Sequence, residues 1–380
     1  MKSTSPASQP RILVAPLDWG LGHATRCIPL IRLLLQKGCT VFLAGEGKVE
    51  HLLRTEFPQL TFIPLEGYRI RYAATGLGLM GAMVQQIPHL LKTIKRENSW
   101  LGQMVKKHGL DAVISDNRYG LHHPSIYSVI ITHQLQIQTP FGTVGNALIQ
   151  KLTYRYINRF NACWVPDSEG APGLAGALSH PAKMPAIPVH YLGPLSRFKK
   201  QEEGLEHYLL VLLSGPEPQR TLLEQKLLAQ VSAYGGPVLF VRGLPGMVGL
   251  PKVPYQVNIV NHLSANAAQQ ALNGAQYVVA RTGYSTVMEL MALQKKSILI
   301  PTPGQTEQQY LAKLLMQYNR ALCLPQHKFD LSKSIELANT FTYNWEGLES
   351  SHHLEQTVDA LLQQLPARKS EAENVSLTAD

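Results

Sequence analysis

A glycine loop near the beginning of the sequence carries a histidine suited to proton transfer. The loop runs from Asp18 to Arg26 (DWGLGHATR), between an apolar run and a helical pattern. Gly20 and Gly22 allow the backbone to approach a ligand closely. A histidine at a helix N-terminus stays neutral near pH 7, because the helix dipole disfavours its charged form. We therefore expect His23 to act as a general base or an oxyanion contact. The alternative is that it only caps its helix.

Two other side chains compete with His23 for the role of base. Asp116 follows the apolar run DAVIS, and His133 follows the run SVIIT. The carboxyl ends of parallel strands carry the ligand-binding loops of a sheet, which places both side chains near a ligand. Each has an alternative interpretation as a hydrogen-bonding residue at a strand end. The sequence leaves open which of the three accepts the proton.

A second loop has the composition of a phosphate site. Ser214 and Gly215 follow the apolar run YLLVLL and precede a helical pattern that begins near Glu217. Free amides and the dipole at such a helix N-terminus attract a phosphate, and Arg220 is expected to reach it. The alternative is an ordinary capped turn.

The densest group of polar side chains lies in the second half of the chain. Two apolar runs there, YVVA and SILI, each lead into a polar loop followed by a helical pattern. A carboxylate such as Glu289 can accept two hydrogen bonds from a ribose diol, and glutamine amides can recognise sugar hydroxyls. The alternative for Glu289 is a capping box with Thr286. The candidate donor-binding residues of this stretch are Arg281, Gly283, Ser285, Thr286, Glu289, Gln305, Thr306, Gln308 and Gln309.

These loops need parallel strands that bring them to a common edge. Apolar runs alternating with glycine loops and helical patterns predict strands in the first half at residues 11–15, 39–44, 60–64, 111–115, 128–132 and 162–165. In the second half they predict strands at residues 208–213, 237–241, 257–260, 277–280 and 297–300. The predicted fold class is α/β, with two Rossmann-like doubly wound parallel-sheet domains that face each other across a cleft.

The composition sets the class of protein and its division into domains. Hydrophobic residues make up 45% and charged residues 16%, which excludes a disordered protein and a coiled coil. Four scattered cysteines without metal-ligand spacing predict a cytoplasmic protein with no bound metal. The predicted boundaries are a flexible N-terminus at 1–10, a first domain at 11–193, a linker at 194–204, a second domain at 205–365 and a flexible tail at 366–380.

The positive charge is concentrated in the first domain. Residues 1–193 hold 19 Lys and Arg against 10 Asp and Glu, so this half carries the whole net charge of +9. Such asymmetry predicts an anionic partner. We expect no specific nucleic acid, because no nucleic-acid-binding motif surrounds the basic residues.

One apolar stretch in this domain suggests what the anionic partner is. Leu77 to Ile94 is apolar and rich in glycine and methionine. Basic residues accompany it at Lys92, Lys95, Arg96, Lys151, Arg155 and Arg159. An apolar patch with a basic rim predicts peripheral contact with an anionic membrane, at its inner face. The alternative is a helix pair packed into the domain core.

Part of the second domain resembles glycosyltransferase family 28. The similarity lies in Arg281-Thr282-Gly283, in Thr286-Val287-x-Glu289 and, without gaps, in Pro301 to Tyr310. The GxGH sequence ending at His23 resembles the family's N-terminal glycine loop. Ser214-Gly215 resembles its second glycine loop, and Gly193-Pro194 the turn before its linker. The family includes the GlcNAc transferase that makes the lipid-linked disaccharide of peptidoglycan, and the plant galactolipid synthases.

The resemblance implies a GT-B fold, with the nucleotide-sugar donor on the second domain and the acceptor on the first. It also implies inversion at the anomeric carbon. The implied contacts are Glu289 with the UDP ribose, Gln308 and Gln309 with the donor sugar, Ser214 and Gly283 with the diphosphate, and the backbone near Leu263 with uracil. Two pairs depart from the family: Asp18-Trp19 replaces small residues, and Thr306-Glu307 replaces an Asp-Arg pair. We therefore expect an acceptor other than the peptidoglycan lipid.

The predicted function is transfer of a hexose or N-acetylhexosamine from a UDP-sugar to a hydroxyl acceptor that is lipid-linked or membrane-associated. The UDP-sugar is the donor substrate, and no cofactor is expected. The sequence contains no DxD motif, which favours a metal-independent reaction. Alternatives are a UDP-sugar 2-epimerase on the same fold, a nucleotide-sugar-binding protein without turnover and, from the glycine loop alone, a dinucleotide oxidoreductase.

Overall fold

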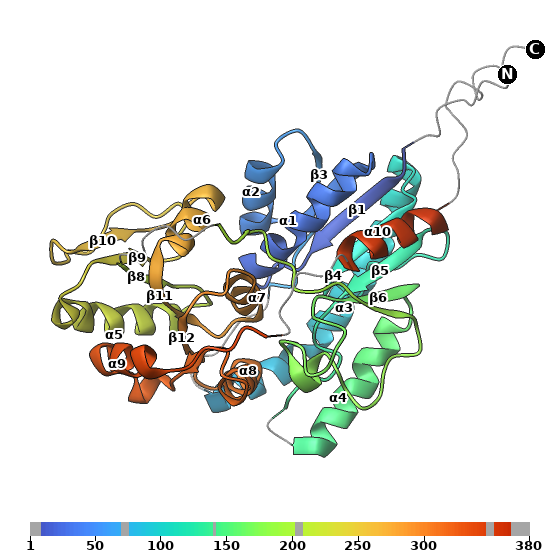
Figure 1. Cartoon of the computed structure of the whole chain (residues 1–380). Helices are drawn as coiled ribbons and strands as arrows, with labels where there is room; N and C mark the ends of the chain where they lie inside the picture. Colours follow the sequence, from blue (N-terminus) through green and yellow to red (C-terminus); the bar gives the residue numbers. More distant parts are fainter. Residues whose placement is uncertain (1–8, 70–75, 140–141, 202–207, 347–352, 366–380) are drawn as a thin grey trace, which may run out of the picture.

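The apolar runs of the sequence form two parallel sheets, one in each half of the chain (Figure 1). The computed structural model describes residues 9–69, 76–139, 142–201, 208–346 and 353–365, and the side chains of residues 76–85 lie outside this description. The flexible ends expected at 1–10 and 366–380 lie outside it too, apart from Gln9 and Pro10.

Within the residues that the structure describes, the first half builds seven strands and four helices. The strands are β1 (Arg11–Pro16), β2 (Thr40–Gly45), β3 (Thr61–Pro64), β4 (Ala112–Asp116), β5 (Tyr127–Ile131), β6 (Ala162–Val165) and β7 (Val189–Tyr191). The helices are α1 (Leu21–Gln36), α2 (Gly47–Glu56), α3 (Gly76–His108) and α4 (Gly142–Ile157), and a single 3₁₀ turn covers Gly176–Leu178.

The second half builds six strands and six helices among the described residues. The strands are β8 (Tyr208–Leu212), β9 (Val238–Val241), β10 (Val257–Val260), β11 (Ala275–Arg281), β12 (Ser297–Ile300) and β13 (Leu322–Cys323). The helices are α5 (Gln219–Tyr234), α6 (Ala265–Asn273), α7 (Tyr284–Ala292), α8 (Thr306–Gln317), α9 (Leu331–Thr340) and α10 (His353–Gln364), with a 3₁₀ turn at Gln326–Lys328.

Strand order reverses once in each sheet. The first sheet runs β3-β2-β1-β4-β5-β6-β7, so its reversal lies between β1 and β4, where Pro16 pairs with Asp116. The second runs β10-β9-β8-β11-β12-β13, with its reversal between β8 and β11. Loops diverge at such a point and leave a crevice at the carboxyl ends of the strands. The crevices lie beside the glycine loop after β1 and beside the loops after β8 and β11.

The predicted α/β class is confirmed, and each predicted strand is present within one residue of its expected ends, except that β11 begins two residues earlier than expected. Strands β7 and β13 were not predicted. Strand β7 (VHY) is half-buried to exposed along its length, and β13 has two residues. Short edge strands need no long apolar run, because one side of each faces no further strand.

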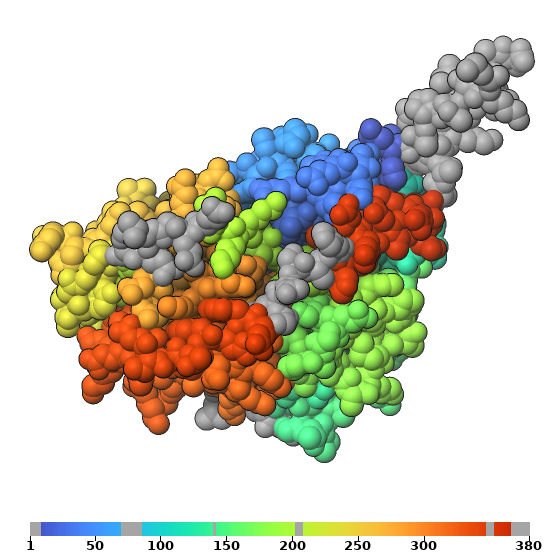
Figure 2. Space-filling model, viewed as in Figure 1, coloured from blue at the N-terminus to red at the C-terminus, as the bar shows by residue number. Residues whose placement is uncertain are grey.

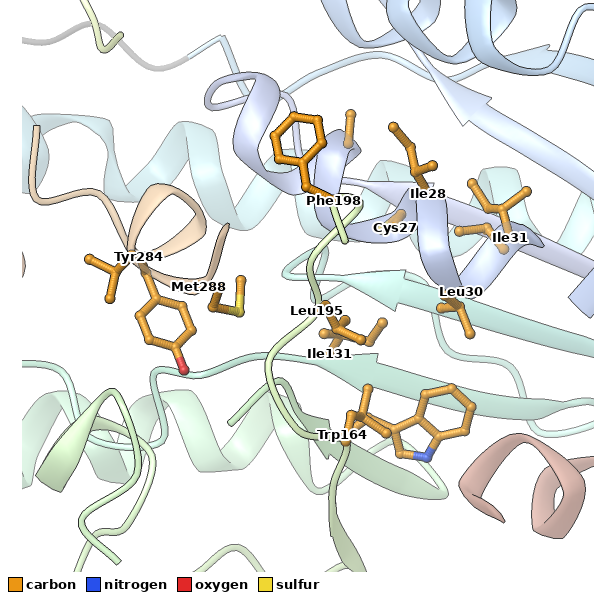
Figure 3. Packing of buried hydrophobic residues seen from close by; sticks show 14 of the residues in the cluster. Cys27, Ile28, Leu30, Ile31, Ile131, Trp164, Leu195, Phe198, Tyr284 and Met288 are labelled. Atoms are coloured by element: carbon orange, nitrogen blue, oxygen red, sulfur yellow. The ribbon is translucent and has the colours of Figure 1, made fainter. Parts of the chain in front are cut away.

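A single apolar cluster joins the two halves of the molecule. Trp164 on β6, Leu195 and Phe198 in the connecting segment, and Tyr284 and Met288 on α7 all belong to it (Figure 3). Each of these side chains is buried. Removing apolar surface from water stabilises their association, so the second sheet is held against the first by packing as well as by the covalent connection.

The last helix crosses back to the first domain. Helix α10 lies against the blue and green lobe in Figure 2, far from the strands that precede it in the sequence. Val358 and Leu361 are buried in the cluster that includes α1. Lys37 Nζ lies 2.8 Å from carboxylate oxygens of both Glu355 and Asp359. The predicted second domain at 205–365 is therefore corrected for residues 353–365, whose apolar face is covered by the first domain.

Candidate active site between the two domains

His23 lies at the reversal point of the first sheet and is the third residue of α1. The helix begins after Gly20, whose φ of 139° is open to glycine but strained for other residues, and no side chain caps it. The alternative that His23 only caps its helix is therefore wrong. His23 Nδ1 lies 2.9 Å from Asp116 Oδ1, and 18% of the His23 side chain is exposed. The ring thus has one nitrogen held by a carboxylate.

Asp116 is fully buried and also binds Arg26, which lies one turn after His23. Arg26 Nε donates to Asp116 Oδ2 at 2.6 Å, and its Nη2 donates to Oδ1. Burial alone raises the pKa of Asp116, but Arg26 and His23 beside it hold that pKa well below its usual range. An ionised carboxylate with these partners is placed to orient His23. Asp116 itself has no exposed surface from which it could accept a proton from a substrate.

The third candidate base, His133, has both ring nitrogens engaged. Nδ1 lies 3.3 Å from Arg26 Nη1, and Nε2 lies 2.8 Å from Glu307 Oε1 on α8. The ring stacks on Tyr284 with centroids 4.0 Å apart and an angle of 9°. Burial lowers the pKa of His133, although Glu307 opposes this shift. His133 is therefore buried, and protein groups contact both of its ring nitrogens.

On the second domain, Glu289 points to the connecting segment. Glu289 lies inside α7, whose N-cap is Gly283 without a side-chain cap, so the capping box with Thr286 does not form. Arg197 Nε donates to Glu289 Oε1 at 2.8 Å. Burial raises the pKa of Glu289, and Arg197 opposes the rise. Arg197 was not predicted; its position three residues after the Gly193-Pro194 turn is the signal that the sequence offered.

Two arginines expected to bind the donor have structural partners instead. Arg220 donates through Nε to Glu217 at 2.6 Å and through Nη1 to Glu224, so its guanidinium is buried inside the second domain. Arg281 donates to the carbonyls of Ile300 and Gln219. Burial lowers the pKa of Arg281 to about 10. Protein groups thus engage both guanidinium groups, which were expected to contact a bound donor.

Three side chains expected at the donor contact the first domain or their own loop. Ser285 Oγ donates to the Gly22 carbonyl at 3.0 Å. A Cβ at Gly22 would lie 2.7 Å from the Ser285 hydroxyl oxygen, so the two loops approach closely. Thr306 Oγ1 donates to the Gln138 carbonyl at 2.8 Å. Gln308 Oε1 accepts the Thr302 N–H at 2.8 Å. The second domain is therefore seated on the first through the same loops that were predicted to hold a ligand.

The remaining predicted residues lie along the edge that carries these loops. Ser214, Gly215 and Gln309 are exposed, whereas Leu263, Gly283, Thr286 and Gln305 are half-buried. The neighbouring Thr282 hydroxyl is buried and has no hydrogen-bond partner among the described residues. Thr282 precedes Gly283 in the loop after β11, so it joins the candidate residues at the carboxyl edge of the second sheet.

No group of three or more His, Cys, Asp or Glu side chains within the described ranges is arranged to hold a metal ion. Over the same ranges, none of the helices combines the length and the apolar character needed to cross a bilayer.

Comparison with known proteins places this arrangement among glycosyltransferases. Residues 255–342 match the glycosyltransferase family 28 C-terminal domain. The chain is 33% identical over 99 residues to the UDP-N-acetylglucosamine–N-acetylmuramyl-(pentapeptide) pyrophosphoryl-undecaprenol N-acetylglucosamine transferase of Methylorubrum populi. That match covers 25% of this chain and 24% of the relative, so it spans about a quarter of each protein.

Two longer matches cover both domains. The enzyme of the same name from Haemophilus ducreyi is 22% identical over 320 residues, covering 81% of this chain and 83% of that relative. The crystal structure of the glycosyltransferase of kitacinnamycin superposes with a TM-score of 0.68 at 15% identity, covering 95% of this chain and all of that one. These matches confirm the GT-B fold and the resemblance to family 28, and they support a transferase.

Removing the charge of Asp116 tests the buried network. In D116N we expect the free energy of unfolding at pH 7 to fall by about 3–5 kcal/mol, because Arg26 is left buried without a counter-ion. The lowered pKa means that the contribution is complete above the unfolded value of about 3.9 and is lost as pH falls toward the folded value. Urea unfolding should therefore show a gap between D116N and wild type that narrows below about pH 4.

The exposed variant E336Q serves as the matched control and should differ from wild type by less than about 0.5 kcal/mol. Equal stability of D116N and wild type at pH 7 would contradict the role given to this carboxylate.

Proposed function

We propose that this protein transfers a hexose or N-acetylhexosamine from a UDP-sugar to a hydroxyl acceptor, with His23 as the base. The observation that carries the proposal is the His23–Asp116 pair, 2.9 Å apart, at the edge of the first sheet on which the donor-side helix α7 is seated through Ser285. The match to the family 28 C-terminal domain supports a nucleotide-sugar donor. The relatives' names, which specify UDP-N-acetylglucosamine, support UDP as its nucleotide.

In the proposed complex the nucleotide binds to the second domain. Glu289 receives the ribose hydroxyls, and Arg197 holds the opposite side of its carboxylate. The diphosphate lies against the exposed loop at Ser214 and Gly215 and against the amides at the start of α7. Free N–H groups and helix dipoles at these positions favour an anion. The same groups stabilise the charge that develops on UDP as it departs.

The chemical step is a single displacement at the anomeric carbon. With its Nδ1–H donating to Asp116, His23 presents the lone pair of Nε2 to the acceptor hydroxyl. Nε2 takes the hydroxyl proton, the acceptor oxygen bonds to the anomeric carbon, and the bond to the UDP oxygen breaks. Such a displacement inverts the anomeric configuration. Asp116 then stabilises the imidazolium that forms.

We further propose that the acceptor reaches the site from a membrane surface. Helix α4 carries Val144, Leu148 and Leu152 on one face, and they are 80%, 61% and 51% exposed. On α3, Ile87 and Leu91 are also exposed. Their exposure disfavours the alternative of a helix pair packed into the core for residues 86–94. The side chains of 77–85 lie outside the described residues. Exposed basic side chains accompany both helices at Lys92, Lys95, Arg96, Lys151, Arg155 and Arg159. This combination suits an anionic bilayer at the cytoplasmic face.

The donor assignment predicts UDP binding that depends on Glu289. Isothermal titration with UDP should show that E289A weakens binding about 10–100-fold, the loss expected for hydrogen bonds to a charged group. The surface variant E336A, on the same domain, should bind UDP like wild type. Unchanged affinity in E289A, or NAD binding in place of UDP, would remove the donor assignment.

The base assignment predicts a selective loss of turnover in H23A. Release of UDP from UDP-GlcNAc, UDP-galactose or UDP-glucose, measured with a detergent dispersion of diacylglycerol as hydroxyl acceptor, should fall about 10²–10⁴-fold. The Kd for UDP should stay within about twofold, because His23 belongs to the first domain. H51A, an exposed histidine on α2, is the control. Formation of an epimerised sugar without acceptor would instead support the epimerase alternative.

The membrane assignment predicts salt-sensitive binding to anionic vesicles. The protein should pellet with phosphatidylglycerol vesicles at low salt and be released at about 0.5 M salt, because the Debye length then falls to a few ångströms. The variant V144S/L148S/L152S should pellet less, whereas L337S, exposed on the second domain, should behave like wild type. Binding to vesicles that does not change with salt concentration, or equal binding to phosphatidylcholine vesicles, would contradict the membrane assignment.

A further inference from the structure

A continuous chain of polar contacts connects the donor-side helix α8 to the proposed base. Glu307 on α8 accepts from His133 Nε2 at 2.8 Å and from Gln134 Nε2 at 2.6 Å. His133 Nδ1 lies 3.3 Å from Arg26 Nη1, and Arg26 holds Asp116, the partner of His23. All of these residues except Glu307 belong to the first domain. Glu307 is therefore connected to His23 through two side chains, His133 and Arg26.

Arg26 also competes directly with Asp116 for the ring of His23. His23 Nδ1 lies 2.9 Å from Asp116 Oδ1 and 3.0 Å from Arg26 Nη2. Because a guanidinium only donates and a carboxylate only accepts, the two contacts require opposite tautomers. With its hydrogen on Nδ1 the ring donates to Asp116 and leaves Nε2 free to take a proton. With its hydrogen on Nε2 the ring accepts from Arg26 and cannot act as a base there.

The orientation of Arg26 depends in turn on His133. Arginine stays protonated, so Nη1 donates and His133 Nδ1 must accept. The hydrogen of neutral His133 then lies on Nε2, where Glu307 accepts it. If Glu307 were withdrawn, His133 could carry its hydrogen on Nδ1, and two donors would face each other across 3.3 Å. Arg26 would be displaced from His133 and its Nη2 would turn further toward His23.

We propose that Glu307 and His133 form an interdomain latch that selects the proton-accepting tautomer of His23 by fixing the orientation of Arg26. The inference rests on the base role proposed for His23 and adds two positioning residues to it. The latch closes only when the second domain is seated, because Glu307 stands beside Thr306, whose hydroxyl donates to the Gln138 carbonyl at 2.8 Å. Stacking of His133 on Tyr284 of α7 holds the same ring from the donor side.

The tautomer itself can be measured without substrate. In the full chain labelled with ¹⁵N-histidine, the imidazole nitrogen shifts identify the protonated nitrogen, and the variant H23N assigns His23 among the 14 histidines. Wild type should show the Nδ1–H form of His23. E307A should increase the Nε2–H form and, in the transfer assay, lower kcat about 10²-fold, the scale expected for a misplaced catalytic group. Its Kd for UDP should change less than about twofold.

The variant E307Q separates positioning from folding. Its amide oxygen can still accept from His133 Nε2, and the Gln134 amide can turn its oxygen toward the new NH₂ group. We expect E307Q to keep the wild-type tautomer and most of kcat, and E336A to match wild type in both. Loss of the Nδ1–H form in E307A with recovery in E307Q supports the latch.

An unchanged His23 tautomer in a folded E307A overturns the latch, whatever the activity. The spectra need no turnover, so this outcome can be distinguished from failure of the proposed function. If only the proposed function fails, wild type neither binds UDP nor releases it, but the His23 tautomer still changes in E307A. Where E307A fails to fold, H133A removes the Glu307–His133 contact from the first domain. The His23 tautomer and kcat of H133A then provide the same test.

Discussion

The buried ion pair between Arg26 and Asp116 is the interaction on which the arrangement of the site depends. Two charges removed from water are costly unless each finds several partners. Asp116 meets this condition with Arg26 and His23, and Arg26 with Asp116 and His133. The pair joins the second turn of α1 to the end of β4, where the strand order reverses. It therefore fixes the one exposed member of the group, His23, at the edge that faces the second domain.

The surface that holds the two domains together also carries the proposed donor loops. Ser285 and Thr306 hydrogen-bond to main-chain carbonyls of the first domain, and Glu307 to two of its side chains. The apolar cluster around Tyr284 and Met288 continues across the same boundary. A change in the seating of the second domain must therefore alter contacts on both sides at once. In the proposed reaction, donor binding and acceptor activation would therefore depend on the same interdomain contacts.

The departures from family 28 acquire a physical meaning in this arrangement. Thr306-Glu307 replaces an Asp-Arg pair, and both residues contact the first domain. Glu307 faces His133 and Gln134, which provide hydrogen-bond donors for its carboxylate. In the glycine loop after β1, Asp18 accepts the Tyr68 N–H at 3.0 Å, and Trp19 lies edge-on to the Tyr68 ring. The differences thus fall where the domains meet and where this glycine loop is held in place.

The sequence by itself determined the elements and the loops that matter. Apolar runs bounded by glycine and proline are local signals, so they located the parallel strands. Short motifs between Arg281 and Gln309 indicated the family 28 domain that residues 255–342 match. Only the tertiary structure shows that Asp116 and His133 are buried among protein partners whereas His23 is partly exposed, because these partners lie about 90 to 170 residues away in the chain. It also turned Arg220 and Arg281 inward and returned α10 to the first domain. These contacts depend on which groups are close in the folded chain, and a local sequence pattern contains no information about that proximity.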